Sequence, residues 1–190
     1  MDRSKPHPTT FEMYLLLNSK GCYDADTLAE LDKLGRPDKM CGWRVPKDLN
    51  DLTMGELADL IMAKDDLMTI IRVVCKAKHP EKVMQERAGI VIGFCNWITK
   101  EFERIGRMFD ETSVPPTPQE AKAGIDRLKF GLFGTIDWYA SRQGYHDQDE
   151  VLKVKWVRIW QCAKQDAEKA MFERRLNKVY QDEQRQASRH

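Results

Sequence analysis

Three prolines within residues 115–118 place the firmest limit on how this chain can fold. Proline has a fixed backbone angle and no N–H donor, and it disfavours helix in the residue before it, so no helix can run through residues 112–118. Thr117 stands one residue before a proline and three before Glu120, which is the pattern of a capping box with proline at the first helical position. The segment therefore predicts a joint between two helical units and a helix that begins directly after it.

Before this joint, apolar residues recur at helical spacing. Thr53 and Glu56 form a capping-box pattern that opens a run with apolar positions as far as Cys75, and the run is expected to end near Pro80. A second helix is predicted over residues 81–109. Two long antiparallel helices with a short connection would form a helical hairpin.

The two ends of the chain differ in regularity. Thr9 or Thr10 can cap one short helix and Asp24 can cap a second, whereas residues 36–50 carry the proline and glycine signals of a loop. After the joint, the helix that begins at residue 118 is expected to reach Leu128. The last helix is expected to begin near Trp156 and to run past residue 180.

The fold class predicted from these patterns is all-α, an irregular helical bundle of about five to seven helices that contains the long antiparallel hairpin. Three regions are expected: an irregular N-terminal region at 1–50, the hairpin at 51–111 and a C-terminal helical unit at 117–190. Within the last region, Gly131 and Gly134 weaken a helix and predict a kink or a close backbone contact.

Composition excludes several classes of function. The 31 Lys and Arg nearly balance the 30 Asp and Glu, and a net charge of +1 gives no global field for nucleic acid or anionic membrane. The longest apolar stretch, residues 90–98, is far below the roughly 20 residues that a membrane span needs. We therefore expect no membrane association.

The cysteines indicate a reducing compartment, for which we expect a cytoplasmic location. Their number, five, is odd, and no Cys-x-x-Cys pair occurs. Three of them lie among apolar residues at helical spacing and are expected to pack in the core: Cys75, Cys95 and Cys162.

No pattern of residues indicates catalysis, a metal or a cofactor, and we predict none of these. His146 with Asp147 and Asp149 could contribute to an assembled site, but acidic residues at a helix start more simply serve as caps. Adjacent carboxylates such as Glu101 and Glu103 are expected on a solvated helix face, and no hydrolase, nucleotide-binding or calcium-binding motif occurs.

Aromatic residues supply the candidate protein-binding positions. Each aromatic within a helix has core packing as its simpler interpretation, but six between residues 130 and 160 exceed what one helix pair ordinarily hides. We expect at least one of these six to be exposed. A tryptophan beside an arginine in the N-terminal loop has the composition of an interface anchor. The candidates are Trp43, Phe130, Phe133, Trp138, Tyr139, Trp156 and Trp160.

A helical DNA-binding regulator is an alternative. Residues 137–158 could form two helices around Gly144, with Lys153, Lys155 and Arg158 as a basic face. Acidic residues in the turn would repel the phosphate groups of nucleic acid, so nucleic acid is the less favoured partner.

Two stretches resemble a protein family. The sequence LTMGEL at residues 52–57 and the stretch at residues 124–160 are similar to small helical late proteins of tailed bacteriophages and prophages, the tail assembly chaperone-like group. The shared features are leucine-threonine followed by glutamate-leucine at a helix start, and an acidic turn before a valine. The resemblance covers about half of the chain.

This resemblance implies a non-enzymatic factor in the host-cell cytoplasm that engages the tape-measure protein or another tail protein before assembly. It supplies no catalytic or cofactor-binding residue. A structural virion or connector component fits as an alternative, and self-association into a homo-oligomer stays open.

Overall fold

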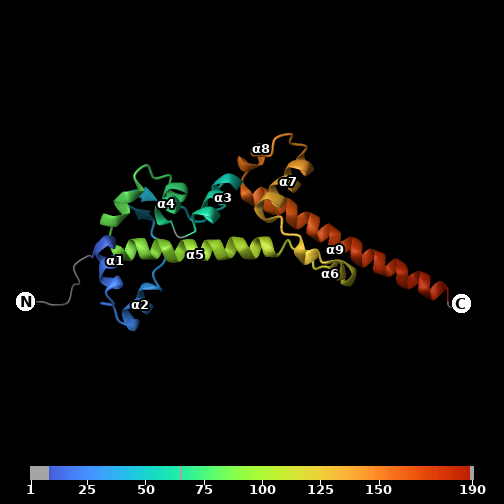
Figure 1. Cartoon of the computed structure of the whole chain (residues 1–190), viewed down its shortest axis with the longest axis horizontal. Helices are drawn as coiled ribbons and strands as arrows, with labels where there is room; N and C mark the ends of the chain where they lie inside the picture. Colours follow the sequence, from blue (N-terminus) through green and yellow to red (C-terminus); the bar gives the residue numbers. More distant parts are fainter. Residues whose placement is uncertain (1–8, 65, 189–190) are drawn as a thin grey trace, which may run out of the picture. The chain divides into compact units, whose positions relative to one another are not determined.

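The computed structural model describes residues 9–64 and 66–188, in which the regular structure is helical except for one short hairpin (Figure 1). The predicted all-α class is confirmed. The chain forms two compact units, which we call the N-terminal unit (Met1–Leu52 and Glu56–Arg104) and the C-terminal unit (Thr53–Gly55 and Ile105–His190).

The N-terminal unit contains short helices around the first part of one long helix, α5 (Figure 1). The side chains of Thr10 and Asp24 accept hydrogen bonds from backbone N–H groups at the starts of α1 and α2, as predicted. In chain order the elements are α1 (Phe11–Ser19), α2 (Ala25–Leu31), β1 (Lys39–Met40), β2 (Trp43–Arg44), α3 (Met54–Ala63), α4 (Leu67–Cys75), the 3-10 helix η1 (Pro80–Gln85) and α5 (Ala88–Asp110).

The single helix predicted to run as far as Cys75 is wrong, because the chain breaks between α3 and α4. Lys64 has a left-handed backbone with φ of 48°, which ends α3. The Asp66 carboxylate then accepts hydrogen bonds from the N–H groups of Met68 and Thr69 and caps α4. The first arm of the predicted hairpin is therefore two short helices.

The second arm is also shorter than predicted. Residues 80–85 form the 3-10 helix η1, and α5 begins only at Ala88, where its N–H donates to the Thr9 carbonyl at 2.9 Å. A long α5 is nevertheless confirmed, as is its end near Phe109.

Close backbone contact holds the segment after α2 against α5. An added Cβ at Gly93 would lie 2.4 Å from the Gly35 carbonyl oxygen, so only glycine fits this position without a shift. The Asn96 amide, less than one turn further along α5, donates to the carbonyls of Leu31 and Leu34 at 2.9 and 3.1 Å. Leu31 is the last residue of α2 and Leu34 lies just beyond it, so these bonds tie the end of α2 and the following turn to α5.

The loop predicted over residues 36–50 contains a β-hairpin. Its two-residue turn has positive φ at both positions, 50° at Cys41 and 81° at Gly42, which is the geometry of a tight hairpin turn. The Glu86 carboxylate accepts the Cys41 N–H at 2.6 Å and ties this turn to the end of η1. Burial raises the Glu86 pKa, but hydrogen bonds from the N–H groups of Arg87 and Cys41 outweigh this and lower it.

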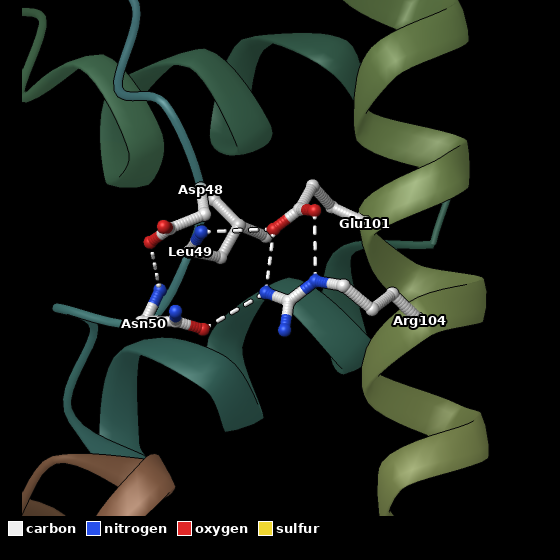
Figure 2. Close-up of polar contacts among 5 residues, drawn as sticks. All are labelled: Asp48, Leu49, Asn50, Glu101 and Arg104. Carbon is white, nitrogen blue, oxygen red and sulfur yellow. Dashed lines mark hydrogen bonds and ion pairs between the residues drawn. The ribbon is translucent and has the colours of Figure 1, made fainter.

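A buried ion pair fixes the next part of the loop to α5 (Figure 2). The Glu101 carboxylate accepts the Leu49 N–H at 2.9 Å and two bonds from Arg104, at 2.9 Å from Nε and 2.7 Å from Nη2. Arg104 Nη2 also donates to the Asn50 amide oxygen at 2.9 Å. Glu101 is only 9% exposed, so the expectation that it lies on a solvated helix face is wrong.

In the C-terminal unit, the predicted capping box is present. Thr117 Oγ1 accepts the Glu120 N–H at 3.2 Å, and the Glu120 carboxylate accepts the Thr117 N–H at 2.7 Å. The helix ends earlier than predicted, because Gly124 is left-handed with φ of 81° and stops it before Leu128. The elements are α6 (Pro118–Ala123), the 3-10 helix η2 (Ile125–Arg127), α7 (Gly131–Gln143), α8 (Asp149–Leu152) and α9 (Trp156–Ala187).

The first turn of α9 forms the core of this unit. Trp156 and Ile159 are fully buried, as is Val151 of α8, and the Trp156 ring lies 5.9 Å from that of Phe109. The predicted start of α9 at Trp156 is confirmed.

The contacts group the chain differently from the three predicted regions. Residues 1–50 belong to the same unit as most of α5, and the division lies after Arg104, inside that helix. The proline segment at 115–118 lies within the C-terminal unit, where a side chain of α9 holds it. The joint predicted at this segment stays a prediction, which limited proteolysis would test.

Candidate protein-binding surface

The structure separates the six aromatic candidates of the C-terminal unit into three groups. Tyr139 and Trp156 are 1% and 0% exposed and belong to the core, so they cannot contact a partner. Trp138 and Trp160 are half-buried, and the Trp160 indole donates to the Met108 carbonyl at 2.6 Å. The other two, Phe130 and Phe133, are exposed.

The exposed pair belongs to a run of apolar side chains between α6 and the first turn of α7. Phe130 is 68% exposed and Phe133 is 62% exposed, which confirms that at least one of the six aromatics faces solvent. Ile125 and Leu128, at 39% and 61%, continue the run. We call residues 125–133 with these four side chains the apolar segment.

The apolar segment is held at both ends by polar contacts to α9. Before it, the Arg174 guanidinium binds the Pro115 carbonyl and the Glu120 carboxylate, the latter at 3.2 Å. After it, Arg142 at the end of α7 binds the Asp166 carboxylate at 3.1 Å. The two α9 positions are eight residues apart, or about 12 Å along a helix. The apolar segment therefore lies between two contacts that hold the flanking parts of the chain against α9.

The glycine pair shapes the start of α7. Gly131 has φ of 56° at the first position of the helix, which a residue with a side chain rarely adopts. A Cβ added at Gly134 would lie 2.5 Å from the Phe130 Cβ, so Gly134 leaves room for Phe130 to lie against the helix. The close neighbour of Gly134 is a side-chain atom one turn earlier, so the kink or close backbone contact predicted from the pair stays a prediction.

Glu120 has two roles at the first anchor, since it completes the capping box and also binds Arg174. The hydrogen bond from the Thr117 N–H, and then the Arg174 charge, lower the pKa of this carboxyl. It is therefore charged at neutral pH, and acidification is expected to weaken the cap and the anchor together.

Trp43 has a different setting from that predicted. It lies opposite Met40 in the β1–β2 pair, and directly opposed residues share one face of a hairpin. Met40 is 1% exposed, so Trp43 lies on the covered face and is half-buried. Only the exposed part of its ring is open to contact, and the interface-anchor role of Trp43 stays a prediction.

Residues around His146 form an open acidic pocket. His146, Asp147 and Asp149 line it together with Asp137. Asp147 accepts the Asp149 N–H at 2.9 Å, but the N-cap residue of α8 is Gln148 and its side chain makes no capping bond, so the predicted capping role is not confirmed. Lys153, Lys155 and Arg158 are exposed near this turn, but the three aspartates give the pocket a charge that repels phosphate. The arrangement gives no support to the DNA-binding alternative.

The cysteines expected in the core are half-buried: Cys75, Cys95 and Cys162. Burial raises the pKa of the Cys75 thiol to about 11 and also raises that of Cys95. A thiol with a raised pKa is a poor nucleophile at neutral pH.

Within residues 9–64 and 66–188, no group of three or more His, Cys, Asp or Glu side chains has an arrangement that could hold a metal ion. None of the described helices combines the length and the apolar character that crossing a membrane requires.

Sequence reasoning placed Ile125 and Leu128 in a longer α6 and did not foresee their exposure. The exposure of three α9 side chains was also not predicted; they are between 52% and 55% exposed: Phe172, Val179 and Tyr180. Each lies at a helical spacing that is equally typical of a buried face, so only tertiary contacts separate the two cases. Comparison with other proteins adds no assignment, because no known protein family, curated protein or solved structure matches this chain.

Proposed function

We propose that the protein is a non-enzymatic assembly factor that binds an apolar surface of another protein through the apolar segment at 125–133. The observation that carries this proposal is the exposure of four large apolar side chains within nine residues, between two anchors on α9. Concentrated apolar exposure on a soluble protein is typical of a partner site.

The two phenylalanines supply most of the binding free energy in this proposal. Full burial of a phenylalanine side chain contributes about 1.5–3 kcal/mol, and about two thirds of each ring remains to be covered. Each ring would then contribute roughly 1–2 kcal/mol, or about a 5–30-fold change in affinity. The contacts of Arg174 and Arg142 hold the chain on either side of the segment, so part of the ordering that opposes binding is already made.

The proposed partner is a phage tail protein whose own apolar assembly surface is uncovered before it enters the tail. This part of the proposal rests on the resemblance of residues 52–57 and 124–160 to the tail assembly chaperone-like group. Such a partner needs apolar side chains that can cover Phe130 and Phe133, which is the chemistry of an amphipathic helix lying on a groove or face.

Co-expression with phage tail proteins, chosen from the genes that neighbour this one if they encode such proteins, tests the proposal. The wild-type chain is expected to keep one of these proteins soluble and to co-purify with it. The variant Phe130→Ser/Phe133→Ser is expected to lose both effects while keeping its own helical content. The matched control is Ile61→Ser/Met62→Ser, which removes side chains that are 51% and 79% exposed in the N-terminal unit.

Equal loss of binding in both variants would show that exposed apolar area in general, and not the apolar segment, is responsible. Failure of the wild type to bind any neighbouring tail protein would exclude the tail assembly role. Mass spectrometry of purified particles separates a factor that is absent from the virion from a structural component that is retained.

A further inference from the structure

A second site, remote in sequence from the apolar segment, lies on the β-hairpin of the N-terminal unit. A pocket of about 290 Å³ opens beside β1 and β2. Four cations and one carboxylate line it, which gives a local net charge of +3, whereas the whole chain carries +1. The lining residues are Arg36, Asp38, Lys39, Arg44, Val45 and Lys47.

Two of these cations stand directly opposite each other. Lys39 pairs with Arg44 in the antiparallel register, and the Val45 N–H donates to the Asp38 carbonyl at 3.0 Å in the next pair. Lys39 and Arg44 therefore form a non-hydrogen-bonded pair, the type in which opposed side chains are closer. Like charges in such a pair destabilise a hairpin unless something neutralises them.

The single carboxylate of the pocket is already bound. Arg36 Nη2 donates to Asp38 at 2.9 Å, and Arg36 Nη1 donates to the Val45 carbonyl at 2.9 Å. These bonds clamp Arg36 across the base of the hairpin. In the described parts of the chain, 9–64 and 66–188, no ion pair or side-chain hydrogen bond involves the other three cations, Lys39, Arg44 and Lys47.

We propose that this pocket binds a compact multivalent oxyanion, a phosphoryl group such as that of phosphate, pyrophosphate or a nucleotide terminus. The guanidinium of Arg44 offers paired donors that match phosphoryl oxygens, and the two lysines add compact positive charge. The small volume accommodates one or two phosphoryl groups. The site is independent of the proposed protein-binding function, because every residue involved belongs to the other unit.

Pyrophosphate is the probe, and inorganic phosphate is the weaker comparison. Isothermal titration of the full chain at low ionic strength is expected to show one pyrophosphate site, and thermal unfolding is expected to shift upward more than with sodium chloride at equal ionic strength. Lys39→Ala/Arg44→Ala is expected to weaken binding at least tenfold. Arg175→Ala/Lys178→Ala removes two exposed cations from α9 and is expected to leave binding unchanged.

The unfolding temperature of Lys39→Ala/Arg44→Ala shows whether this variant is folded. Because the substitutions remove two opposed cations, this temperature is expected to rise at low salt. The single variants Lys39→Ala and Arg44→Ala provide the same test if the double variant folds poorly. Absence of binding at millimolar pyrophosphate, or equal binding by the pair variant and wild type, would overturn the proposal. Tighter binding of hexaglutamate or of a short oligonucleotide than of pyrophosphate would also overturn it.

Discussion

Removal of the Glu101 carboxylate is expected to destabilise the N-terminal unit strongly. In Glu101→Ala, the buried Leu49 N–H loses a charged acceptor at 2.9 Å, a loss that costs about 1–3 kcal/mol. The Arg104 side chain is 29% exposed, so water takes over part of its role and the lost ion pair adds about 1 kcal/mol or less. The expected total is roughly 1–4 kcal/mol.

The same carboxylate predicts how this stability depends on pH. Burial raises the Glu101 pKa, but hydrogen bonds from Arg104 and from the Leu49 N–H outweigh burial, and the folded pKa lies below its usual value. A lowered folded pKa contributes stability that is complete above the unfolded pKa, about 4.3 for glutamate, and is lost as pH falls through the folded value. The difference in unfolding free energy between wild type and Glu101→Gln should therefore become smaller as the pH is lowered.

Urea unfolding followed by circular dichroism, with hydrogen exchange at the Leu49 amide, measures these effects. A loss of 3 kcal/mol corresponds to a midpoint lower by roughly 1–3 M urea. Glu101→Gln keeps an oxygen acceptor for Leu49 and should lose about half as much, while Glu173→Gln, an isosteric change at an exposed position, should have no effect. If Glu101→Ala leaves both the urea midpoint and the hydrogen-exchange protection of the Leu49 amide unchanged, the ion pair does not hold this loop against α5.

Three further changes have defined outcomes. Thr117→Ala removes the side-chain half of the capping box and should lower the unfolding free energy by about 1 kcal/mol, which a shift of the urea midpoint would reveal. Cys41→Asn places a residue that tolerates positive φ in the hairpin turn and should raise the free energy of unfolding by about 0.5–1 kcal/mol. The unfolding temperature should rise accordingly, and a lower temperature would contradict this account of the turn. Iodoacetamide at pH 8 should label exposed Cys22 first, because a thiol pKa of about 11 leaves Cys41 and Cys75 only about one thiolate in a thousand; mass spectrometry of timed samples would expose any reversal.

Local signals in the sequence predicted the helix ends that local bonds determine. The capping box at Thr117 involves residues three apart, and the structure reproduces it in both directions. Thr10 and Asp24 are simple caps of the same kind. Each of these depends on atoms that the sequence itself brings together, so no tertiary contact can easily override it.

Breaks inside an apolar pattern were harder to predict. The periodicity before Cys75 continues across the end of α3, although Lys64 turns left-handed and Asp66 starts a new helix. An aspartate three residues before a threonine was the available signal, since Asp66 accepts both the N–H and the hydroxyl of Thr69. Apolar spacing alone cannot separate one long helix from two short ones that bury the same side.

The candidate surface was predictable in location but not in detail. The excess of aromatics between residues 130 and 160 indicated exposure, and Phe130 and Phe133 are exposed. Tyr139 and Trp156 are also aromatic residues in helical patterns, yet they lie in the core. Likewise, nothing local distinguishes Glu101 from Glu103, because the partner at Leu49 lies 52 residues away.

The close approach of Gly35 to α5 determines which sequence changes this helix can accept. At Gly93 even alanine would collide with a backbone oxygen at 2.4 Å, so related sequences should keep glycine there. Gly89 has only a leucine methyl at 3.6 Å, an ordinary contact, and should accept alanine. At Gly106 no described atom lies within 4 Å, so alanine should be favoured by about 1 kcal/mol of helix propensity. A saturation library of these three glycines would therefore show three grades of tolerance along a single helix.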